Sequence, residues 1–347
     1  MSVRLEDACL DPLSPPRPVA PYHDESRAAW VLSRYADVMA AFREPRLSTD
    51  SGRSADGPEV SGEALKAQVR TDIIGALSPT KVTEWQAKLE PLAVELIDRL
   101  PCDRAVDIVE EFARPLCLAA ALMVTGADRS DGERIERLAR QVSVATASPA
   151  DPALEADGTA ANTELERSFQ NCGFPLSGPT FVGVSQGLPC FLANAWLALV
   201  REPVELARLR ADPDLMPRAI EELLRFAGIA RKFSRYALAP VPLGGIVIPE
   251  GARVMLMLAS ANRDPEQFTD PDRLDLSRRV AGHVAFGAGP HSCVGAALLR
   301  MAGAVATRVF VERCAEYEAV GATEWRGGSG FRWAASLPVR LRPCGDV

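Results

Sequence analysis

The segment 284–301, VAFGAGPHSCVGAALLRM, constrains the fold most, because it joins a glycine-rich loop to an apolar helix. Gly287, Gly289 and Gly295 allow tight turns and the close approach of a flat or bulky group, since glycine has no Cβ. We expect the helix to begin near Val294. The loop therefore presents one cysteine, Cys293, at the start of a helix.

Cys293 is a candidate metal ligand. The positive end of a helix macrodipole and inward-pointing backbone amides both favour a thiolate, and a thiolate can bind a metal ion. Phe286 is placed to shield one side of the sulfur, and His291 to act as a hydrogen-bond donor beyond the loop. A buried structural cysteine after a glycine turn explains the same pattern, so the rest of the chain has to decide between the two.

The composition excludes several classes of protein. A net charge of −7 argues against nucleic acid as the main partner, since phosphate binding needs a basic excess. No apolar run reaches the roughly 18 residues of a membrane span, and residues 1–16 lack a signal-peptide stretch, so we expect a cytoplasmic protein without a membrane partner. The eight scattered cysteines have no CxxC spacing and suggest neither disulfides nor zinc.

The N-terminal part of the chain alternates short β segments with helices. After an irregular, proline-rich lead-in over 1–28, residues 29–33 are strand-like and 35–42 have a helical pattern. A later amphipathic helix carries Lys66 and Arg70 on one face, four residues apart. These two cations either form a solvated face or point at a buried anion.

The most apolar segment, 180–200, is apolar almost all round, and a helix here is expected to lie in the centre of the protein. Pro189 inside this helix frees the carbonyl of Ser185 and is expected to bend the axis. The preceding segment 147–179 has no sustained apolar stripe and several breakers. We expect only short or mobile structure there.

A helix over 203–226 contains Glu222 and Arg225, three residues apart, and their significance depends on whether they are buried. The next segment, 233–254, alternates and turns as β-hairpins do. An irregular, aspartate- and proline-rich meander over 261–279 then leads to the cysteine loop.

Taken together, these motifs resemble those of the bacterial cytochrome P450 haem-thiolate proteins. The sequence FGAGPHSCVG at 286–295 matches the F-G-x-G-x-H-x-C-x-G pattern of that family at every fixed position. Glu222 and Arg225 match its Glu-x-x-Arg motif, which joins a meander arginine in a buried ion-pair network, and Arg273 is the expected third member. The resemblance implies a mainly α fold with small β-sheets, in one domain over 1–347.

The resemblance also implies a cofactor, haem b, with Cys293 as the iron ligand. Arg70, Arg235 and His291 are then expected to contact the haem propionates, because arginine pairs well with carboxylates. Lys66 stands where many relatives have a histidine and is a further candidate for the same role. Phe286, Gly287 and Gly295 of the cysteine loop complete the implied haem site.

The central helix departs from the family pattern. Relatives deliver protons from an acid followed by a threonine, and those positions hold Gln186 and Gly187 here. In one reading, the enzyme is a monooxygenase in which a substrate hydroxyl, Ser185 or an ordered water replaces the threonine. In a second, the haem uses peroxide or catalyses a dehydration or rearrangement. In a third, the protein is a non-catalytic helper of another enzyme, although the retained Cys293 argues against this.

Length is the second departure, because the chain is expected to be shorter than its relatives before Ala29 and across 147–179, where the family has the helices that cover the distal pocket. A shortened lid suits a bulky substrate or one bound to a carrier protein. We expect the protein to tailor a secondary metabolite. A ferredoxin-type electron donor is expected to dock near Arg278, Arg279 and Arg300.

Overall fold

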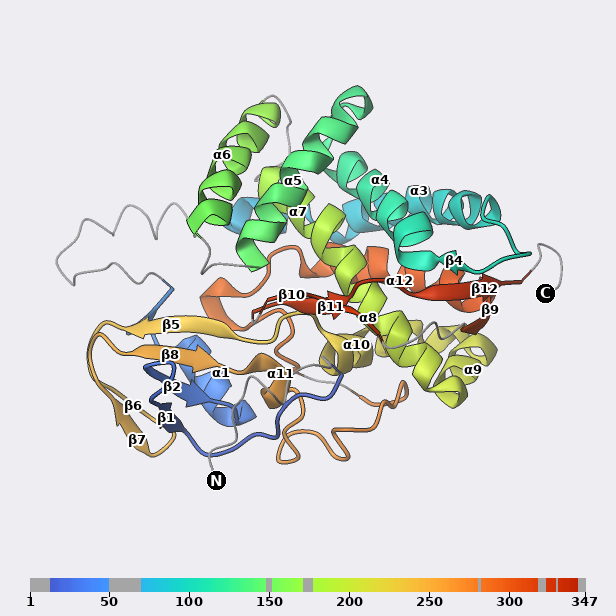
Figure 1. The fold of residues 1–347 in the computed structure, drawn as a ribbon. Coiled ribbons are helices and arrows are strands. Elements are labelled where there is room, and N and C mark those ends of the chain that lie inside the picture. The colour runs from blue at the N-terminus through green and yellow to red at the C-terminus, as the bar shows by residue number, and fades with distance from the viewer. Residues whose placement is uncertain are drawn as a thin grey trace.

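The computed structural model describes residues 13–49, 70–147, 152–170, 177–279, 282–317, 323–328 and 330–342. Most of these residues are helical (Figure 1). The α-helices are α1 (Tyr35–Arg43), α3 (Pro79–Asp98), α4 (Arg114–Thr125), α5 (Gly132–Ala147), α6 (Pro152–Ser168), α7 (Ser177–Val182), α8 (Leu188–Arg201), α9 (Pro203–Ala211), α10 (Met216–Ala227), α11 (Leu258–Ala261) and α12 (Ala296–Arg313). The shorter helical turns are η1 (Val109–Ala113), η2 (Arg129–Asp131), η3 (Gly183–Gly187), η4 (Pro213–Leu215) and η5 (Gly289–His291).

Helix α8 lies in the centre of the molecule, as its uniformly apolar sequence predicts. Trp196 of α8 is fully buried and stacks between Phe112 and Phe310, with ring centroids 6.0 and 4.5 Å away. Its indole N–H donates to the Thr307 hydroxyl at 3.2 Å, so the polar atom of this side chain is satisfied inside the core. The contact joins α8 to α12, the helix that follows the cysteine loop.

The expected irregularity in the central helix is present as the π-helical turn η3. The N–H of Leu188 donates to the carbonyl of Gly183, five residues back, which is the π-helical pattern. Pro189 has no N–H to offer the carbonyl of Ser185, so a regular α-helical hydrogen bond is lost at this point. The sequence therefore widens the helix beside the candidate site.

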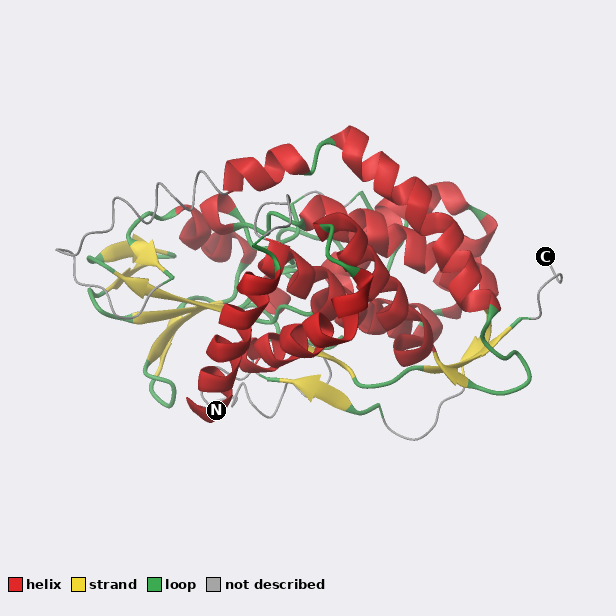
Figure 2. Cartoon of the chain, turned by 90° about the horizontal axis from the view of Figure 1, so that it is seen from above, coloured by secondary structure: helices red, strands yellow, loops and turns green. Residues whose placement is uncertain are grey.

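The strands form small sheets at the edges of the helical body (Figure 2). One sheet has five strands in the order β1 (Tyr22–Asp24), β2 (Ala29–Leu32), β8 (Arg253–Leu256), β5 (Phe233–Ala237) and β3 (Leu47–Ser48). Strands β2 and β8 are parallel, and the other pairs of this sheet are antiparallel.

The remaining sheets are shorter. They contain β4 (Val106–Asp107), β12 (Pro338–Leu341) and β9 (Cys314–Tyr317), then β6 (Val241–Leu243) with β7 (Ile246–Ile248), and β10 (Trp325–Gly327) with β11 (Arg332–Ala334). The predicted hairpin between 233 and 254 is confirmed in the pairs β6–β7 and β5–β8. The predicted fold class, mainly α with small β-sheets, is thus correct.

Two expectations about irregular segments are wrong. The lead-in expected over 1–28 contains strand β1, which pairs with β2 and so belongs to the larger sheet. Most of 147–179 was expected to be short or mobile, but α6 is a helix of 17 residues. Helix α6 packs closely on α5, since a Cβ on Gly158 would lie 2.3 Å from the Cβ of Ala145. Close helix contact, which the apolar pattern did not reveal, stabilises this region.

Helix α5 is also tied to α6 by polar contacts. The Arg134 guanidinium donates to Glu164 at 2.8 Å and to the Ser168 hydroxyl at 3.0 Å. In Figure 1 the two helices stand together above the body of the molecule.

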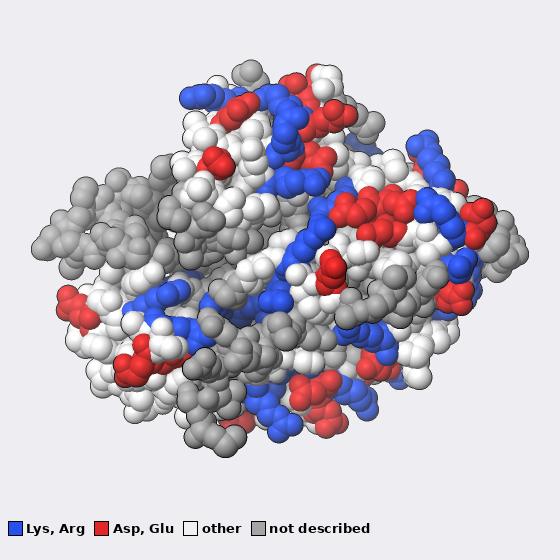
Figure 3. Space-filling model, viewed as in Figure 1, with Lys and Arg blue, Asp and Glu red and all other residues white. Residues whose placement is uncertain are grey.

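One helical segment of the described chain, Gly178–Arg201, is long and apolar enough to cross a membrane by length and composition. However, 83% of its most apolar window is buried inside the protein, as expected for the core helix that α8 forms. On the face shown in Figure 3, acidic and basic side chains lie in mixed groups.

Candidate haem site

Hydrogen bonds and two left-handed glycines shape the cysteine loop. The N–H of Val284 donates to the Asn262 side chain at 2.8 Å, which anchors the start of the loop to the meander. Within the loop, the N–H of Cys293 donates to the carbonyl of Phe286 at 2.9 Å. Gly287 and Gly289 have φ angles of 67° and 69°, in the region where other residues are strained. The sequence motif thus forces the chain to turn and present Cys293.

The glycines of the loop have different roles. A Cβ at Gly289 would lie 2.5 Å from the carbonyl oxygen of Phe42, so helix α1 also requires glycine there. Gly295 has a φ of −80°, which any residue tolerates, and an added Cβ would lie 3.9 Å from the sulfur of Cys293. Helix α12 begins directly after it, at Ala296, two positions later than the predicted start at Val294. The role of Gly295 in holding a cofactor stays a prediction.

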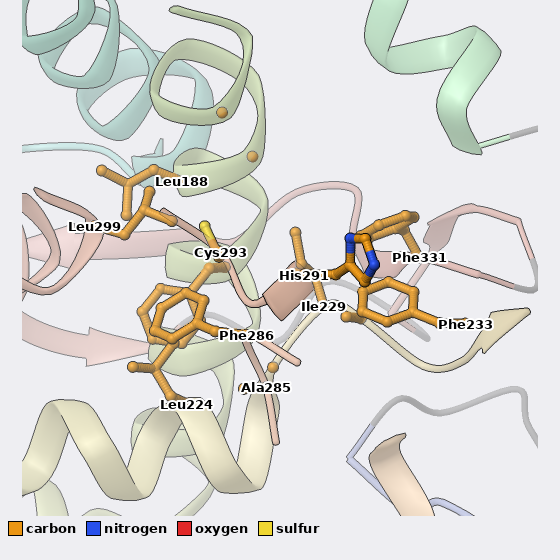
Figure 4. A pocket seen from close by; sticks show the side chains of 15 residues that line it. Leu188, Leu224, Ile229, Phe233, Ala285, Phe286, His291, Cys293, Leu299 and Phe331 are labelled. Atoms are coloured by element: carbon orange, nitrogen blue, oxygen red, sulfur yellow. The ribbon is translucent and has the colours of Figure 1, made fainter. Parts of the chain in front are cut away.

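The sulfur of Cys293 faces an apolar cavity of about 290 Å³ between the cysteine loop and the central helix. In Figure 4 the sulfur points towards Leu188, and Phe286 lies beside it. The ring of His291 lies near Phe233 and Phe331 at the other end of the cavity. Among the described lining residues, Cys293 and His291 carry the side chains that ligate iron in proteins.

Burial dominates the acidity of Cys293. Loss of solvent raises the pKa of the thiol, and the Gly295 backbone N–H, followed by Arg300 and Arg70, offsets this only in part. The loop thus favours the thiolate as expected, but in the metal-free protein burial outweighs this contribution. A bound metal ion has to replace the thiol proton, as is general for cysteine ligands.

A buried cation without a described anionic partner lies beside the cavity. Arg235 on β5 is 6% exposed, its guanidinium lies 5.5 Å from the Phe42 ring centroid, and it donates to the Ser234 carbonyl at 2.9 Å. Burial lowers its pKa. Arg235 and His291 both line a neighbouring cleft of about 320 Å³. A ligand with carboxylates at one edge would supply the counter-charge that Arg235 lacks among the described residues.

One of the two cations of the predicted basic helix, Arg70, contacts the cysteine loop. Arg70 donates to the carbonyl of Ser292 at 2.6 Å and to its hydroxyl at 2.7 Å, directly beside Cys293. It therefore braces the cysteine loop, and its contact with a propionate stays a prediction. Lys66 lies outside the described residues.

The residues expected to deliver protons are only partly brought together. Gly187 lines the cavity beside Cys293. Gly187 and Gln186 both line a second pocket of about 190 Å³. Ser185 is 3% exposed and lines neither pocket, although its hydroxyl lies 3.4 Å from the Gln186 amide nitrogen. Of these groups, only the Gln186 amide is therefore placed to face a ligand.

Sequence reasoning missed three polar groups of the second pocket. Ser143 and Thr146 reach it from α5, and Cys190 from α8. The thiol of Cys190 donates to the Gln186 carbonyl at 3.0 Å, and burial raises its pKa to about 12, so it is a neutral group. No local motif marks these residues, because only the packing of α5 against the central helix brings them together.

The Glu222 and Arg225 pair is fully buried. Two hydrogen bonds of 2.7 and 2.8 Å join the guanidinium to both carboxylate oxygens, and neither side chain is exposed. Arg225 also donates to the carbonyl of Asn262 at 2.8 Å. Asn262 in turn accepts from Val284, so the pair reaches the cysteine loop through the meander.

The prediction that Arg273 is the third member of this network is wrong. Arg278, not Arg273, donates to Glu222, at 3.0 Å, and its side chain is only 13% exposed. The Arg273 side chain is 67% exposed and pairs with Asp275, and only its backbone carbonyl faces the network. Arg278 also donates to the carbonyls of Asp270 and Arg273, at 3.1 and 3.2 Å, and the sequence spacing does not reveal these contacts.

The predicted docking arginines are not a free cluster either. Arg278 is held in the buried network. Arg300 is paired with both carboxylate oxygens of Glu221, at 2.5 and 3.0 Å. Arg279 is exposed. Most of the positive charge expected at this surface is therefore already neutralised by partners within the chain.

The chemistry of the site fits a flat, largely apolar cofactor. Its cavity is apolar and offers one sulfur ligand, and a buried guanidinium, that of Arg235, lines the neighbouring cleft, which shares His291 with the cavity. These features define the class of proteins that bind haem through a cysteine.

Comparisons agree with this class. The Cytochrome P450 family profile matches residues 208–314. Cytochrome P450 107B1 of Saccharopolyspora erythraea is 31% identical, over 90% of this chain and 89% of the relative. The 6-deoxyerythronolide B hydroxylase of the same organism is 28% identical, over 93% of both chains. The crystal structure of P450BioI with an acyl carrier protein has a TM-score of 0.79 at 21% identity, over 90% and 92% of the chains.

The chain belongs to the cytochrome P450 family. It has the fold of that family, the family implies a haem cofactor, and the named relatives identify the protein as a P450-type monooxygenase.

The corrected network gives a prediction with a control in the same loop. Replacing Arg278 with Met removes one of the two guanidinium partners of the buried Glu222 carboxylate, while Arg225 remains, and is expected to lower the free energy of unfolding by about 1.5–3 kcal/mol. Replacing Arg273 with Met breaks only an exposed pair and is expected to cost at most about 1 kcal/mol. Urea unfolding followed by circular dichroism measures both. Equal losses, or a larger loss for the Arg273 variant, would show that the assignment is wrong.

Proposed function

We propose that this protein is a cytoplasmic monooxygenase that carries haem b on Cys293 and oxidises a secondary metabolite. The observation that carries the proposal is the sulfur of Cys293 at an apolar cavity beneath the widened central helix. A role in secondary metabolism is supported by relatives such as the 6-deoxyerythronolide B hydroxylase.

The described residues have separate tasks at this site. Cys293 would bind the iron, and Arg235 and His291 would hold the carboxylates of the cofactor, while Arg70 braces the loop. Phe286, Leu188 and Leu299 provide apolar lining of the cavity that the sulfur faces. A thiolate-ligated haem supplies oxygen activation, because the sulfur pushes electron density towards the iron.

Proton delivery has to differ from that of relatives with an acid and a threonine. Glutamine cannot release a proton at neutral pH, but its amide both donates and accepts hydrogen bonds and can hold a water in place. Gly187 leaves room, since an added Cβ would meet nothing within 4 Å. We propose that Gln186 orients a water or a substrate hydroxyl that occupies the space beside Gly187.

The substrate is proposed to be a neutral small molecule, free or bound to a carrier protein. The second pocket offers hydroxyl, amide and thiol groups but no charged side chain among its described lining residues. A neutral substrate suits such a lining, because an unpaired charge would be costly to bury. Carrier-bound substrates are compatible with the fold, since P450BioI has been crystallised with an acyl carrier protein.

The missing threonine keeps a second function open, in which the haem uses peroxide or catalyses a dehydration or rearrangement. Turnover with peroxide alone, but not with dioxygen and a reductant, would favour that function.

The haem ligand is tested first. The reduced protein is expected to give the carbon monoxide difference spectrum of a thiolate-ligated haem, and Cys293→Ala is expected to lose it. Cys102→Ser, at an exposed cysteine, is the control and is expected to keep it. A wild-type chain that takes up no haem would instead indicate a helper protein.

The role of Gln186 is tested by the coupling of oxygen consumption to product. General acid–base groups contribute about 10²–10⁴ in rate, and a group that only orients water contributes less, so Gln186→Ala is expected to lower coupled turnover by about tenfold. Gln170→Ala, the same substitution at an exposed glutamine, is the matched control. Unchanged turnover and coupling in Gln186→Ala would rule the role out.

A ferredoxin-type electron donor is proposed to bind near Arg279, which is exposed, whereas Arg278 and Arg300 of the predicted cluster are paired with Glu222 and Glu221. Electrostatic docking predicts that the rate of reduction falls as ionic strength rises. Stopped-flow reduction of the haem-loaded protein by ferredoxin measures this. A rate independent of salt would remove the proposed docking surface.

A further inference from the structure

A cluster of charged groups lies behind the cysteine loop, on the side away from the central helix. Glu221 of α10 accepts hydrogen bonds from Arg300 of α12, at 2.5 and 3.0 Å, and lies 3.1 Å from Nε2 of His283. Nδ1 of His283 accepts from the N–H of Ala285 at 3.2 Å. His283 is therefore the tautomer that carries its proton on Nε2 and donates to Glu221.

The charge of this cluster is well defined. Burial opposes the ionisation of Glu221, but the hydrogen bonds from His283 and Arg300 and the charge of Arg300 lower its pKa to about 2. The carboxylate is thus ionised throughout the neutral range, and it holds one positive guanidinium in a fixed place. The Glu221 and Arg300 charges compensate each other locally.

The cluster contacts Phe286, the aromatic side chain beside the sulfur of Cys293. The guanidinium of Arg300 lies over the Phe286 ring, 5.0 Å from its centroid, and the His283 ring centroid lies 5.9 Å from that of Phe286. Arg300 is also one of two cations whose field reaches the sulfur of Cys293. Phe286, in turn, lines the cavity beside Cys293.

We infer that Glu221, Arg300 and His283 form a positioning cluster that sets the reduction potential of the haem through the field at its sulfur ligand. This inference rests on the proposed function, in which Cys293 ligates haem. Arg300 supplies positive charge close to the ligand, and Glu221 both orients that charge and partly cancels it. His283 fixes the remaining side of Glu221.

The sign of each effect follows from Coulomb's law. One-electron reduction of the ferric haem makes the site more negative, so neighbouring positive charge favours the reduced form. Glu221→Gln removes a negative charge and keeps the side-chain shape, and the reduction potential is expected to rise. Arg300→Met removes the positive charge, and the potential is expected to fall. The double variant is expected to return towards the wild-type value.

Shifts of the reduction potential in opposite directions distinguish an electrostatic role of the cluster from a purely structural one. Both single variants break the same ion pair, so a purely structural role would shift the potential in one direction for both. Arg300→Lys keeps the charge and is expected to stay near wild type. Arg308→Met is the matched control. Arg308 lies about two turns further along α12, lines the same groove as Arg300 and pairs with Glu90 at 3.0 Å.

The experiment is a spectroelectrochemical titration of the haem-loaded variants at low ionic strength, because Arg300 is 39% exposed and salt screens its charge. If Arg300→Met does not hold haem, Arg300→Gln takes its place. Shifts of the same sign, or no shift in either variant while the Cys293 ligand is retained, would overturn the inference. A wild-type chain without haem would overturn the proposed function, and the inference with it.

Discussion

The buried carboxylate of Glu222 is the interaction on which the rest of the structure depends. It has no exposed surface, and such a charge is tolerated only when partners satisfy it fully. Arg225, Arg278 and the N–H of Asp275 provide those partners. Arg225 also donates to the carbonyl of Asn262, and the side chain of Asn262 accepts from the N–H of Val284. One set of hydrogen bonds therefore joins α10, the meander and the cysteine loop. The position of Cys293 is therefore decided by a network that does not touch it.

The cavity beside Cys293 combines two local irregularities of the backbone. On one side, left-handed glycines turn the loop so that the sulfur faces inward. On the other, Pro189 and the π-helical turn widen the central helix next to Gly187. The region between these elements is apolar, with Arg235 at one edge and the Gln186 amide near the other. Such a distribution suits a cofactor that is apolar over most of its area and charged at one edge.

The family places this chain among haem monooxygenases, while the central helix departs from the acid and threonine found in relatives. An apolar pocket with amide, hydroxyl and thiol groups can order a water, but its described residues have no acid to give up a proton near neutral pH. Behind the loop, the Glu221 and Arg300 pair offers charge of both signs close to the sulfur shield. In the proposed enzyme, proton supply through Gln186 and the electrostatic field of the Glu221–Arg300 pair would therefore act on the haem from different parts of the site.

The sequence by itself determined the features that are local in the chain. The loop that presents Cys293, the buried central helix with its break at Pro189, the hairpins and the Glu222–Arg225 pair all follow from spacing, apolar pattern and the special backbones of glycine and proline. Only the tertiary structure decided that Arg278 rather than Arg273 points inward, that α6 is stabilised by contact with α5, and that Ser185 lines neither pocket. These outcomes depend on contacts between segments far apart in the chain. Burial and electrostatics act through space, and a residue's sequence neighbours do not reveal which distant groups surround it.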